Sequence, residues 1–275
     1  MKPIWLILIM VNLIFTAPAW AGSVILKTKT ACWVTGTGIR VRLTAANAGD
    51  QAAHLLTVLA RFGQAAQAKS TWPYLGPGDS ATADLDLKER PAKPGLYPVF
   101  IRVSFYDHKG APVSGVAYGL FAVGAWRKSN LDIKEQEIKL EDKAGLKLEV
   151  RNDDKLPHQV RISLFCPQEI AAPQGESSLS LGAGQSGTAS FDLVNASAQA
   201  GVTYPVLASV EYEAEGGHFV STAWVRVQAA AGEPFFKKHR GWILVAAAVL
   251  IFLALLAQFP SLGRYFPGRK NRSKG

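Results

Sequence analysis

The stretch LGPGDS at residues 75–80 returns as LGAGQS at residues 181–186, 106 positions further along a chain of 275 residues. The likeness continues downstream of this turn, where Asp86 returns as Asp192 at the same offset. Self-similarity at a fixed period indicates a structural unit that occurs more than once. The sequence therefore predicts two copies of one module.

The two copies extend over residues 22–128 and 129–230. Asn47, at the end of an apolar alternating run, corresponds to Asn152 at the end of another. Asparagine is typical of turns because its short side chain hydrogen-bonds to nearby backbone groups. Each copy has the size of a single β-sandwich domain.

Several segments alternate between apolar and polar residues, which indicates strands with one buried face. The clearest are GIRVRLTAA (38–46), VFIRVSFY (99–106) and LKLEVR (146–151). Gly, Pro, Asn and Asp separate such runs, and no helical period occurs before residue 241. The predicted fold is all-β, with two tandem Ig-like β-sandwiches followed by one transmembrane α-helix.

The order of motifs in each copy resembles the bacterial CARDB-type and NPCBM-associated Ig-like modules. An alternating strand ends in Asn-Ala-Gly-Asp (47–50), and the leucine-glycine turn at residue 75 follows an apolar strand. A further strand then opens with Gly-x-Tyr-x-Val at residues 95–99. The resemblance implies a seven-stranded sandwich in an extracytoplasmic setting. It implies no active site, since such modules bind glycans or proteins or act as spacers.

The N-terminus has the three parts of a secretory signal peptide. Lys2 precedes an apolar run at residues 4–15, and small residues stand at Ala19 and Ala21. We expect cleavage after Ala21, so that residues 1–21 are removed. An uncleaved N-terminal anchor is the alternative, because only one cation precedes the apolar run.

A second apolar run, GWILVAAAVLIFLALLAQF, occupies residues 241–259 without a charged side chain. A helix of this length spans about 28 Å, close to the ~30 Å hydrocarbon core of a bilayer. This run is the predicted transmembrane helix, and residues 260–275 form a basic tail.

The residues that produce the formal net charge of +9 lie next to these two apolar runs. Between residues 22 and 236 the cations and the carboxylates balance at 21 each. Besides Lys2, the excess consists of cations that flank the predicted span: Lys237, Lys238, Arg240, Arg264, Arg269, Lys270, Arg272 and Lys274. Five cations beyond the span against three before it predict a cytoplasmic tail and periplasmic modules. The lipid bilayer, not nucleic acid, is therefore the expected partner of this charge.

The two copies differ in charge, with a net of +7 for residues 22–128 and −7 for residues 129–236. Opposite fields favour docking of one module on the other, or the presentation of two faces to partners. Chance divergence of two solvated surfaces is the competing interpretation.

Comparison of the copies singles out two aromatic residues. At the offset of 106, Trp72 and Tyr74 stand where Ser178 and Ser180 alternate with leucines. We expect both aromatic side chains to face solvent, as a strip that binds a protein partner or stacks on sugar rings. Packing against a neighbouring loop or the other module is the alternative.

The two cysteines, Cys32 and Cys166, fall in different modules. In an oxidising compartment they can form one disulfide that staples the modules together. The alternative is a pair of buried thiols that pack as small apolar side chains.

Metal-binding and catalytic motifs do not emerge from the sequence. The five histidines lack the spacing of a metal site, and the Gly-x-Gly sequences at residues 36–38 and 182–184 lie between predicted strands. No serine stands in a nucleophile elbow. We therefore expect neither an enzyme, nor a cofactor, nor a metal.

Taken together, these patterns predict a single-pass protein of the bacterial inner membrane with two periplasmic sandwiches. The expected role is that of an accessory or scaffold protein, making protein contacts in a secretion, surface-polysaccharide or appendage system. The alternative is a glycan- or ligand-binding module that the C-terminal helix tethers to the membrane.

Overall fold

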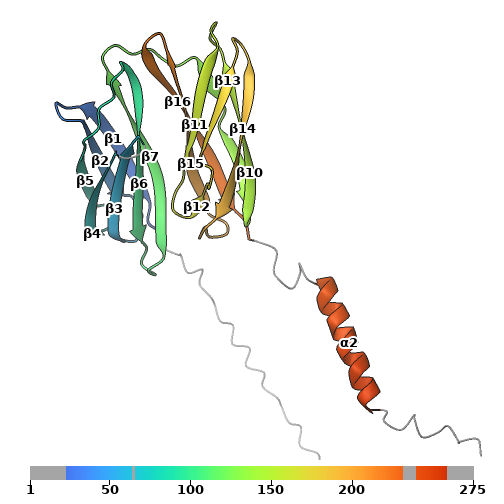
Figure 1. Cartoon of the computed structure of the whole chain (residues 1–275). Helices are drawn as coiled ribbons and strands as arrows, with labels where there is room; N and C mark the ends of the chain where they lie inside the picture. The colour runs from blue at the N-terminus through green and yellow to red at the C-terminus, as the bar shows by residue number, and fades with distance from the viewer. Residues whose placement is uncertain (1–22, 64–65, 232–239, 259–275) are drawn as a thin grey trace, which may run out of the picture. The chain divides into compact units, whose positions relative to one another are not determined.

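The computed structural model of the chain describes residues 23–63, 66–231 and 240–258. The predicted signal peptide and the basic tail lie outside this description. The described residues fall into two units, one up to Ala230 and one from Ala231 onward. The first unit consists of β-strands (Figure 1), which confirms the predicted fold class for this part of the chain.

Seven strands form the first module. They are β1 (Leu26–Val34), β2 (Ile39–Asn47), β3 (Ala53–Phe62), β4 (Ala66–Leu75), β5 (Ser80–Leu87), β6 (Gly95–Tyr106) and β7 (Pro112–Val123). One sheet has the order β1-β2-β5, and the facing sheet has β4-β3-β6 with β7 on the free side of β6. Strand β2 alternates as predicted, because Ile39, Val41 and Leu43 are buried while Arg40 and Arg42 face outward.

The second module repeats this arrangement with additional short strands. It contains β8 (Leu131–Ile133), β9 (Gln136–Leu140), β10 (Lys143–Asn152), β11 (His158–Phe165), β12 (Ile170–Ala171), β13 (Glu176–Leu181), β14 (Ser186–Asn195), β15 (Thr203–Ala214) and β16 (Gly217–Ala229). One sheet has the order β12-β14-β10-β8, and the other has β13-β11-β15-β16 with β9 beside β16.

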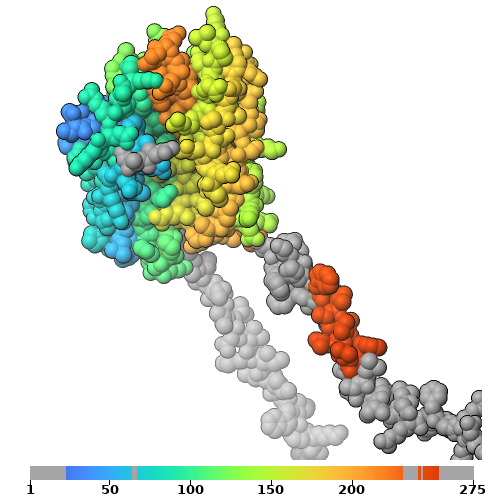
Figure 2. Space-filling model, viewed as in Figure 1, coloured from blue at the N-terminus to red at the C-terminus, as the bar shows by residue number. Residues whose placement is uncertain are grey.

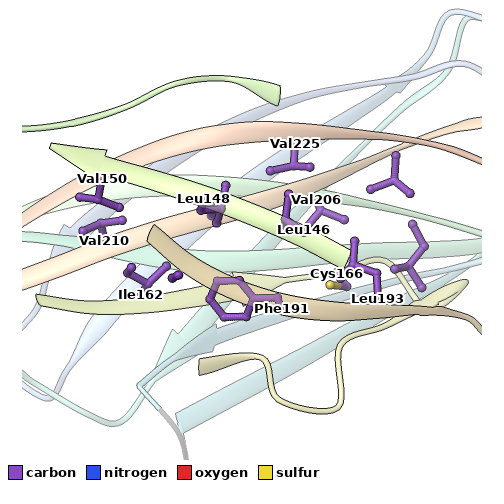
Figure 3. Packing of buried hydrophobic residues seen from close by; sticks show 14 of the residues in the cluster. Leu146, Leu148, Val150, Ile162, Cys166, Phe191, Leu193, Val206, Val210 and Val225 are labelled. Atoms are coloured by element: carbon purple, nitrogen blue, oxygen red, sulfur yellow. The ribbon is translucent and has the colours of Figure 1, made fainter. Parts of the chain in front are cut away.

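Each module has a hydrophobic core of its own. In the second module, Leu148 and Phe191 from one sheet face Ile162, Val210 and Val225 from the other (Figure 3). The first core is built by residues between Ile39 and Phe121, and the second by residues between Leu131 and Ala229.

The repeated turn sequence packs around a buried asparagine in both modules. Asn47 donates from Nδ2 to the carbonyl oxygen of Leu75 at 3.2 Å, and Asn152 donates to that of Leu181 at 3.3 Å. Both asparagines are at most 1% exposed. The leucine-glycine turn therefore recurs because the asparagine that ends a neighbouring strand needs its carbonyl groups.

A close approach of two backbones joins the modules. The N–H of His218 donates to the carbonyl oxygen of Pro94 at 2.9 Å, and Gly95 pairs with His218 as a parallel bridge. This bridge connects the β4-β3-β6 sheet of the first module with the β13-β11-β15-β16 sheet of the second. Together they form one sheet with the order β13-β11-β15-β16-β6-β3-β4. In the space-filling view, the strands of both modules belong to one continuous body (Figure 2).

Helix α2 (Arg240–Gln258) covers all of the second apolar run except Phe259, which is not described. Its described large apolar side chains are exposed, among them Trp242, Leu250 and Ile251. Judged on the described residues alone, no helix combines the length and the hydropathy that crossing a bilayer requires.

Cys32 and Cys166 are free thiols in this structure, so the disulfide that the sequence left possible is not formed here. Cys32 packs against the core of the first module beside Gly119, whereas Cys166 belongs to the core of the second. Burial raises the pKa of Cys32 to about 12 and that of Cys166 to about 11. The alternative interpretation, two buried thiols that pack as apolar side chains, describes both residues.

Candidate functional site

Trp72 does not face solvent, so the expectation of a Trp72–Tyr74 strip is wrong for this residue. Trp72 pairs with the fully buried Leu56, and directly opposed residues of an antiparallel pair share one face. Trp72 is accordingly half-buried and packs against the core of the first module.

The cause is one additional residue in each of two paired strands. Leu55 has a φ of +51°, and the register between β3 and β6 shifts next to it. Pro73 lies opposite Leu55 in β4 and displaces that strand by the same step. Trp72 therefore corresponds in space to Leu179, whose partner Val160 is also buried. A constant offset of 106 misses this shift.

Tyr74 does face solvent, with 57% of its surface exposed, and it is part of a row that crosses three strands. Tyr74 pairs with His54, and His54 pairs with Tyr106 on the other side. The rings of His54 and Tyr74 meet edge to face, with centroids 5.5 Å apart. Tyr106 is 45% exposed and the neighbouring Leu55 is 55% exposed. We call Tyr74, His54, Tyr106 and Leu55 the aromatic row.

A cleft of about 260 Å³ adjoins the aromatic row. Its lining is Leu55, Thr57, Leu59, Lys69, Arg102, Ser104, Phe105, Tyr106, Pro112 and Gln168. The lining includes two cations, and no carboxylate among the described residues. Two of the cations of the first module, Lys69 and Arg102, thus lie beside its exposed aromatic side chains.

Arg102 is the most constrained of these cations. Its Nη2 donates to the carbonyl oxygen of Cys166 at 2.9 Å, and its guanidinium carbon lies 5.3 Å from the ring centre of Phe165. Its Nε is buried without a hydrogen-bond partner in the described structure. Burial lowers the pKa of the guanidinium from its ordinary value. A buried donor without a partner costs free energy until an acceptor reaches it.

A larger cleft of about 400 Å³ lies between the modules. Phe100 of β6 stacks on Phe165 at the end of β11, with centroids 5.2 Å apart. Arg61, Arg161, Glu176 and Glu211 also line this cleft, so that it contains cations and carboxylates together. This lining does not favour a ligand of either charge.

The contacts between the modules follow their opposite charges. Lys93 pairs with Glu213, and Arg127 pairs with Glu215 at 3.1 Å. In both pairs the cation belongs to the first module and the carboxylate to the second. The structure therefore assigns part of the charge difference to docking of the two modules, one of the interpretations left open by the sequence.

His218 lies at the centre of this contact. Its ring stacks on that of Tyr97, with centroids 4.1 Å apart and an angle of 2° between the planes. Its Nε2 lies 3.2 Å from Oε2 of Glu211, without the alignment of a hydrogen bond. The hydroxyl of Tyr97 donates to the carbonyl oxygen of Lys93 at 3.0 Å, which holds the stacked ring in place.

The histidines and the cations near the apolar run form no further candidate site among the described residues. The described residues include no group of three or more metal-ligating side chains. His158 contacts Asp154 within its own module at 2.9 Å. Of the cations that flank the apolar run, Arg240 is the first residue of α2. The others lie outside the described residues: Lys237, Lys238, Arg264, Arg269, Lys270, Arg272 and Lys274.

Comparisons with known proteins give no family. No family matches the sequence, and no curated protein matches it. Among solved structures, a PapD-like domain of human CEP192 is similar over 38% of this chain and 89% of its own, with 11% identity and a TM-score of 0.30. The Escherichia coli chaperone DraB is similar over 39% of this chain and 59% of its own, with 15% identity and a TM-score of 0.29.

The native form of Escherichia coli alpha-2-macroglobulin is similar over a longer part of this chain. The alignment covers 75% of this chain but 17% of that protein, with 9% identity and a TM-score of 0.30. Likenesses of this strength carry no argument about function. The resemblance to CARDB-type and NPCBM-associated modules stays a prediction.

Proposed function

We propose that this protein is a non-enzymatic, membrane-anchored scaffold whose two sandwiches form one rigid arm for contacts with other envelope proteins. The observation that carries the proposal is the docking of the modules. Two domains that serve only as flexible spacers move relative to one another and do not require a shared sheet, stacked rings or ion pairs at their contact. Here Gly95 and His218 join the sheets, and Ser114 binds Glu169 across the contact.

The anchor in this proposal is the apolar run at residues 241–259. Its support is the 19-residue helix α2, the uncharged sequence and the exposure of apolar side chains such as Trp242 and Ile251. Exposed apolar side chains in such number are costly in water and favourable in lipid. The proposal places the sandwiches in the periplasm of a bacterium and the tail in the cytoplasm.

Fractionation tests the anchor. The full-length protein is expected to stay in the membrane pellet after a carbonate wash, and a version that ends at Ala231 is expected to be released. Protease added to spheroplasts should digest the sandwiches and spare a tag after Gly275. Release of the full-length protein by carbonate would refute the anchor.

Cross-linking in intact cells, followed by purification in mild detergent, tests the scaffold. We expect a discrete complex that is larger than the chain and that disappears when the contact between the modules is broken by Glu169→Ala. Glu149→Ala, on the exposed face of β10, is the control. Recovery of the monomer alone would remove the support for a scaffold.

The alternative role, a tethered module that binds a glycan or other ligand, keeps one of its two predicted residues. Tyr74 is exposed, whereas Trp72 packs against the core.

A further inference from the structure

We infer that the aromatic row of the first module and the adjoining cleft bind an acidic glycan. Sugar rings stack on Tyr74, His54 and Tyr106, and a carboxylate of the glycan meets Lys69 and Arg102. The inference does not depend on the scaffold role or on the membrane anchor, since it concerns a surface of the first module and a cleft to which the second module contributes Gln168.

The first observation is the geometry of the row. Tyr74, His54 and Tyr106 stand side by side on adjacent strands, and each has a buried neighbour in its own strand: Leu75, Ala53 and Phe105. The three rings therefore project from one face of the sheet. Two strand spacings amount to about 10 Å, which suits two consecutive rings of a glycan chain.

The second observation is the backbone at Leu55. A leucine with positive φ is strained, and here its large side chain is also exposed to solvent. Neither property favours the folded module. Strain of this kind concentrates at functional sites, where a binding partner benefits from the resulting arrangement. The bulge at Leu55 also leaves two successive residues of β3, His54 and Leu55, exposed.

The third observation is charge. Lys69 and Arg102 line the cleft, and Nε of Arg102 has no partner. Glu169 does not line the cleft, and both of its carboxylate oxygens accept hydrogen bonds from Ser114, but its negative charge still acts on Arg102 and offsets part of the positive charge. Among the described residues, the lining itself carries two cations, no carboxylate, and the hydroxyls of Thr57 and Ser104, which suits a carboxylate on a hydroxylated ring.

A glycan fits these features better than an acidic protein segment does. Strand β3, at the centre of the row, is paired on both sides by β4 and β6, so a peptide strand cannot add along it, although β4 itself ends the sheet. A cleft of about 260 Å³ accommodates one sugar unit or one side chain, but not a protein surface. The exposed apolar area is limited to a few rings, whereas stable protein interfaces bury about 800 Å² on each partner.

Calorimetric titration of the full-length protein, in a detergent without a sugar head group, tests the inference. The probes are hexamers of galacturonate and mannuronate, neutral maltohexaose and short poly-glutamate. We expect binding of at least one uronate hexamer, with affinity at least tenfold above that for maltohexaose or poly-glutamate. Raising the salt from about 50 to about 500 mM should weaken this binding, because the ion pairs are exposed.

Three variants locate the site. Tyr74→Ala and Tyr106→Ala should each weaken uronate binding about five- to tenfold by removing a stacking ring. Lys69→Gln should weaken it about threefold and reduce the salt dependence. Arg102 is left intact because it also bonds to Cys166 across the modules. The matched controls are Trp126→Ala and Lys147→Gln, two exposed residues outside the row and the cleft.

Each contrary result overturns the inference. Failure of both uronates to bind excludes these acidic glycans, and equal binding of maltohexaose removes the role of charge. Equal binding of poly-glutamate identifies the surface as one for acidic peptides. Uronate binding that Tyr74→Ala, Tyr106→Ala and Lys69→Gln leave unchanged places the site elsewhere.

Discussion

Ser114 of β7 donates both its backbone N–H and its hydroxyl to the carboxylate of Glu169, each at 2.6 Å. The hydroxyl oxygen of Ser114 also accepts the N–H of Gln168 at 2.7 Å. Ser114 and Glu169 are almost fully buried and belong to different modules. A turn of the second module is thus fastened to an edge strand of the first by charge-assisted hydrogen bonds, which exceed neutral ones in strength.

Glu169→Ala is expected to lower the free energy of unfolding by about 2–3 kcal/mol, because it leaves a buried N–H without an acceptor. Glu169→Gln keeps one acceptor oxygen and should cost less. Urea denaturation measures the change, and hydrogen exchange of the Ser114 amide should accelerate in the alanine variant. Glu149→Ala is the control, and an equal effect of both alanine variants would contradict a special role of Glu169.

Gly95→Ala should break the bridge between β6 of the first module and β16 of the second. Gly95 has a φ of +151°, and a Cβ there would overlap with the carbonyl oxygen of His218. We expect a loss of at least about 2 kcal/mol in thermal or urea unfolding. Gly145→Ala in β10 is the matched control, since its Cβ would meet no atom within 4 Å. That variant should be neutral or more stable by about 0.5–1 kcal/mol.

Asn47→Asp and Asn152→Asp should each destabilise their own module. In Asn152, Nδ2 donates to the carbonyl oxygens of Leu156 and Gly182 at 2.8 and 3.0 Å. A carboxylate at this position has no proton to donate and faces carbonyl oxygens in a buried site. The expected loss is about 2–3 kcal/mol for each variant, measured by urea denaturation. Asn195→Asp, at a partly exposed strand end, should cost less.

The pKa of Glu213 is expected to lie below its ordinary value, because the ammonium of Lys93 donates a hydrogen bond to its carboxylate. A depressed pKa in the folded state adds stability above the unfolded-state pKa, and this stability is lost as the pH falls through the folded-state pKa. The pair is exposed, so the contribution is below about 1 kcal/mol. Carboxyl NMR titration of wild type and Lys93→Gln provides the test: the variant should return Glu213 to the ordinary range, and an unchanged midpoint would contradict the pairing.

Cys32 and Cys166 are expected to react slowly with iodoacetamide at pH 8 in the native protein. Burial raises the pKa of both thiols, to about 12 and about 11, so little of the reactive thiolate is present. Both should react rapidly in urea. Mass spectrometry of the non-reduced protein should find two alkylated thiols after unfolding, and a mass without alkylation would reveal the disulfide that the structure lacks.

The sequence predicted the β-sandwich fold because the responsible signals are local. Alternation in β2 and β10 follows from the period of a strand, and the turns at Gly78 and Gly184 follow from their positive φ. The likeness between residues 75–80 and 181–186 added a long-range signal of duplication, since each stretch supplies carbonyl groups to a buried asparagine.

The candidate site was harder to predict because it depends on pairing. Trp72 and Tyr74 stand two positions apart, which predicts one face, yet Leu55 and Pro73 add a residue to each paired strand and turn Trp72 inward. The adjacent Leu55 and Leu56 break the alternation of β3 and were the available sign of a bulge. Neither His54 nor Tyr106 carries a local signal, because sheet pairing alone brings them beside Tyr74.

By itself, the sequence determined the strands, the duplication and the opposite charges of the two copies, because these depend on side-chain period and composition. The tertiary structure decided that the modules dock through Ser114 and Glu169, that Cys32 and Cys166 stay apart, and that Tyr74 joins a row. Such contacts arise between residues far apart in the chain, and no local pattern encodes which of many chemically suitable partners will meet.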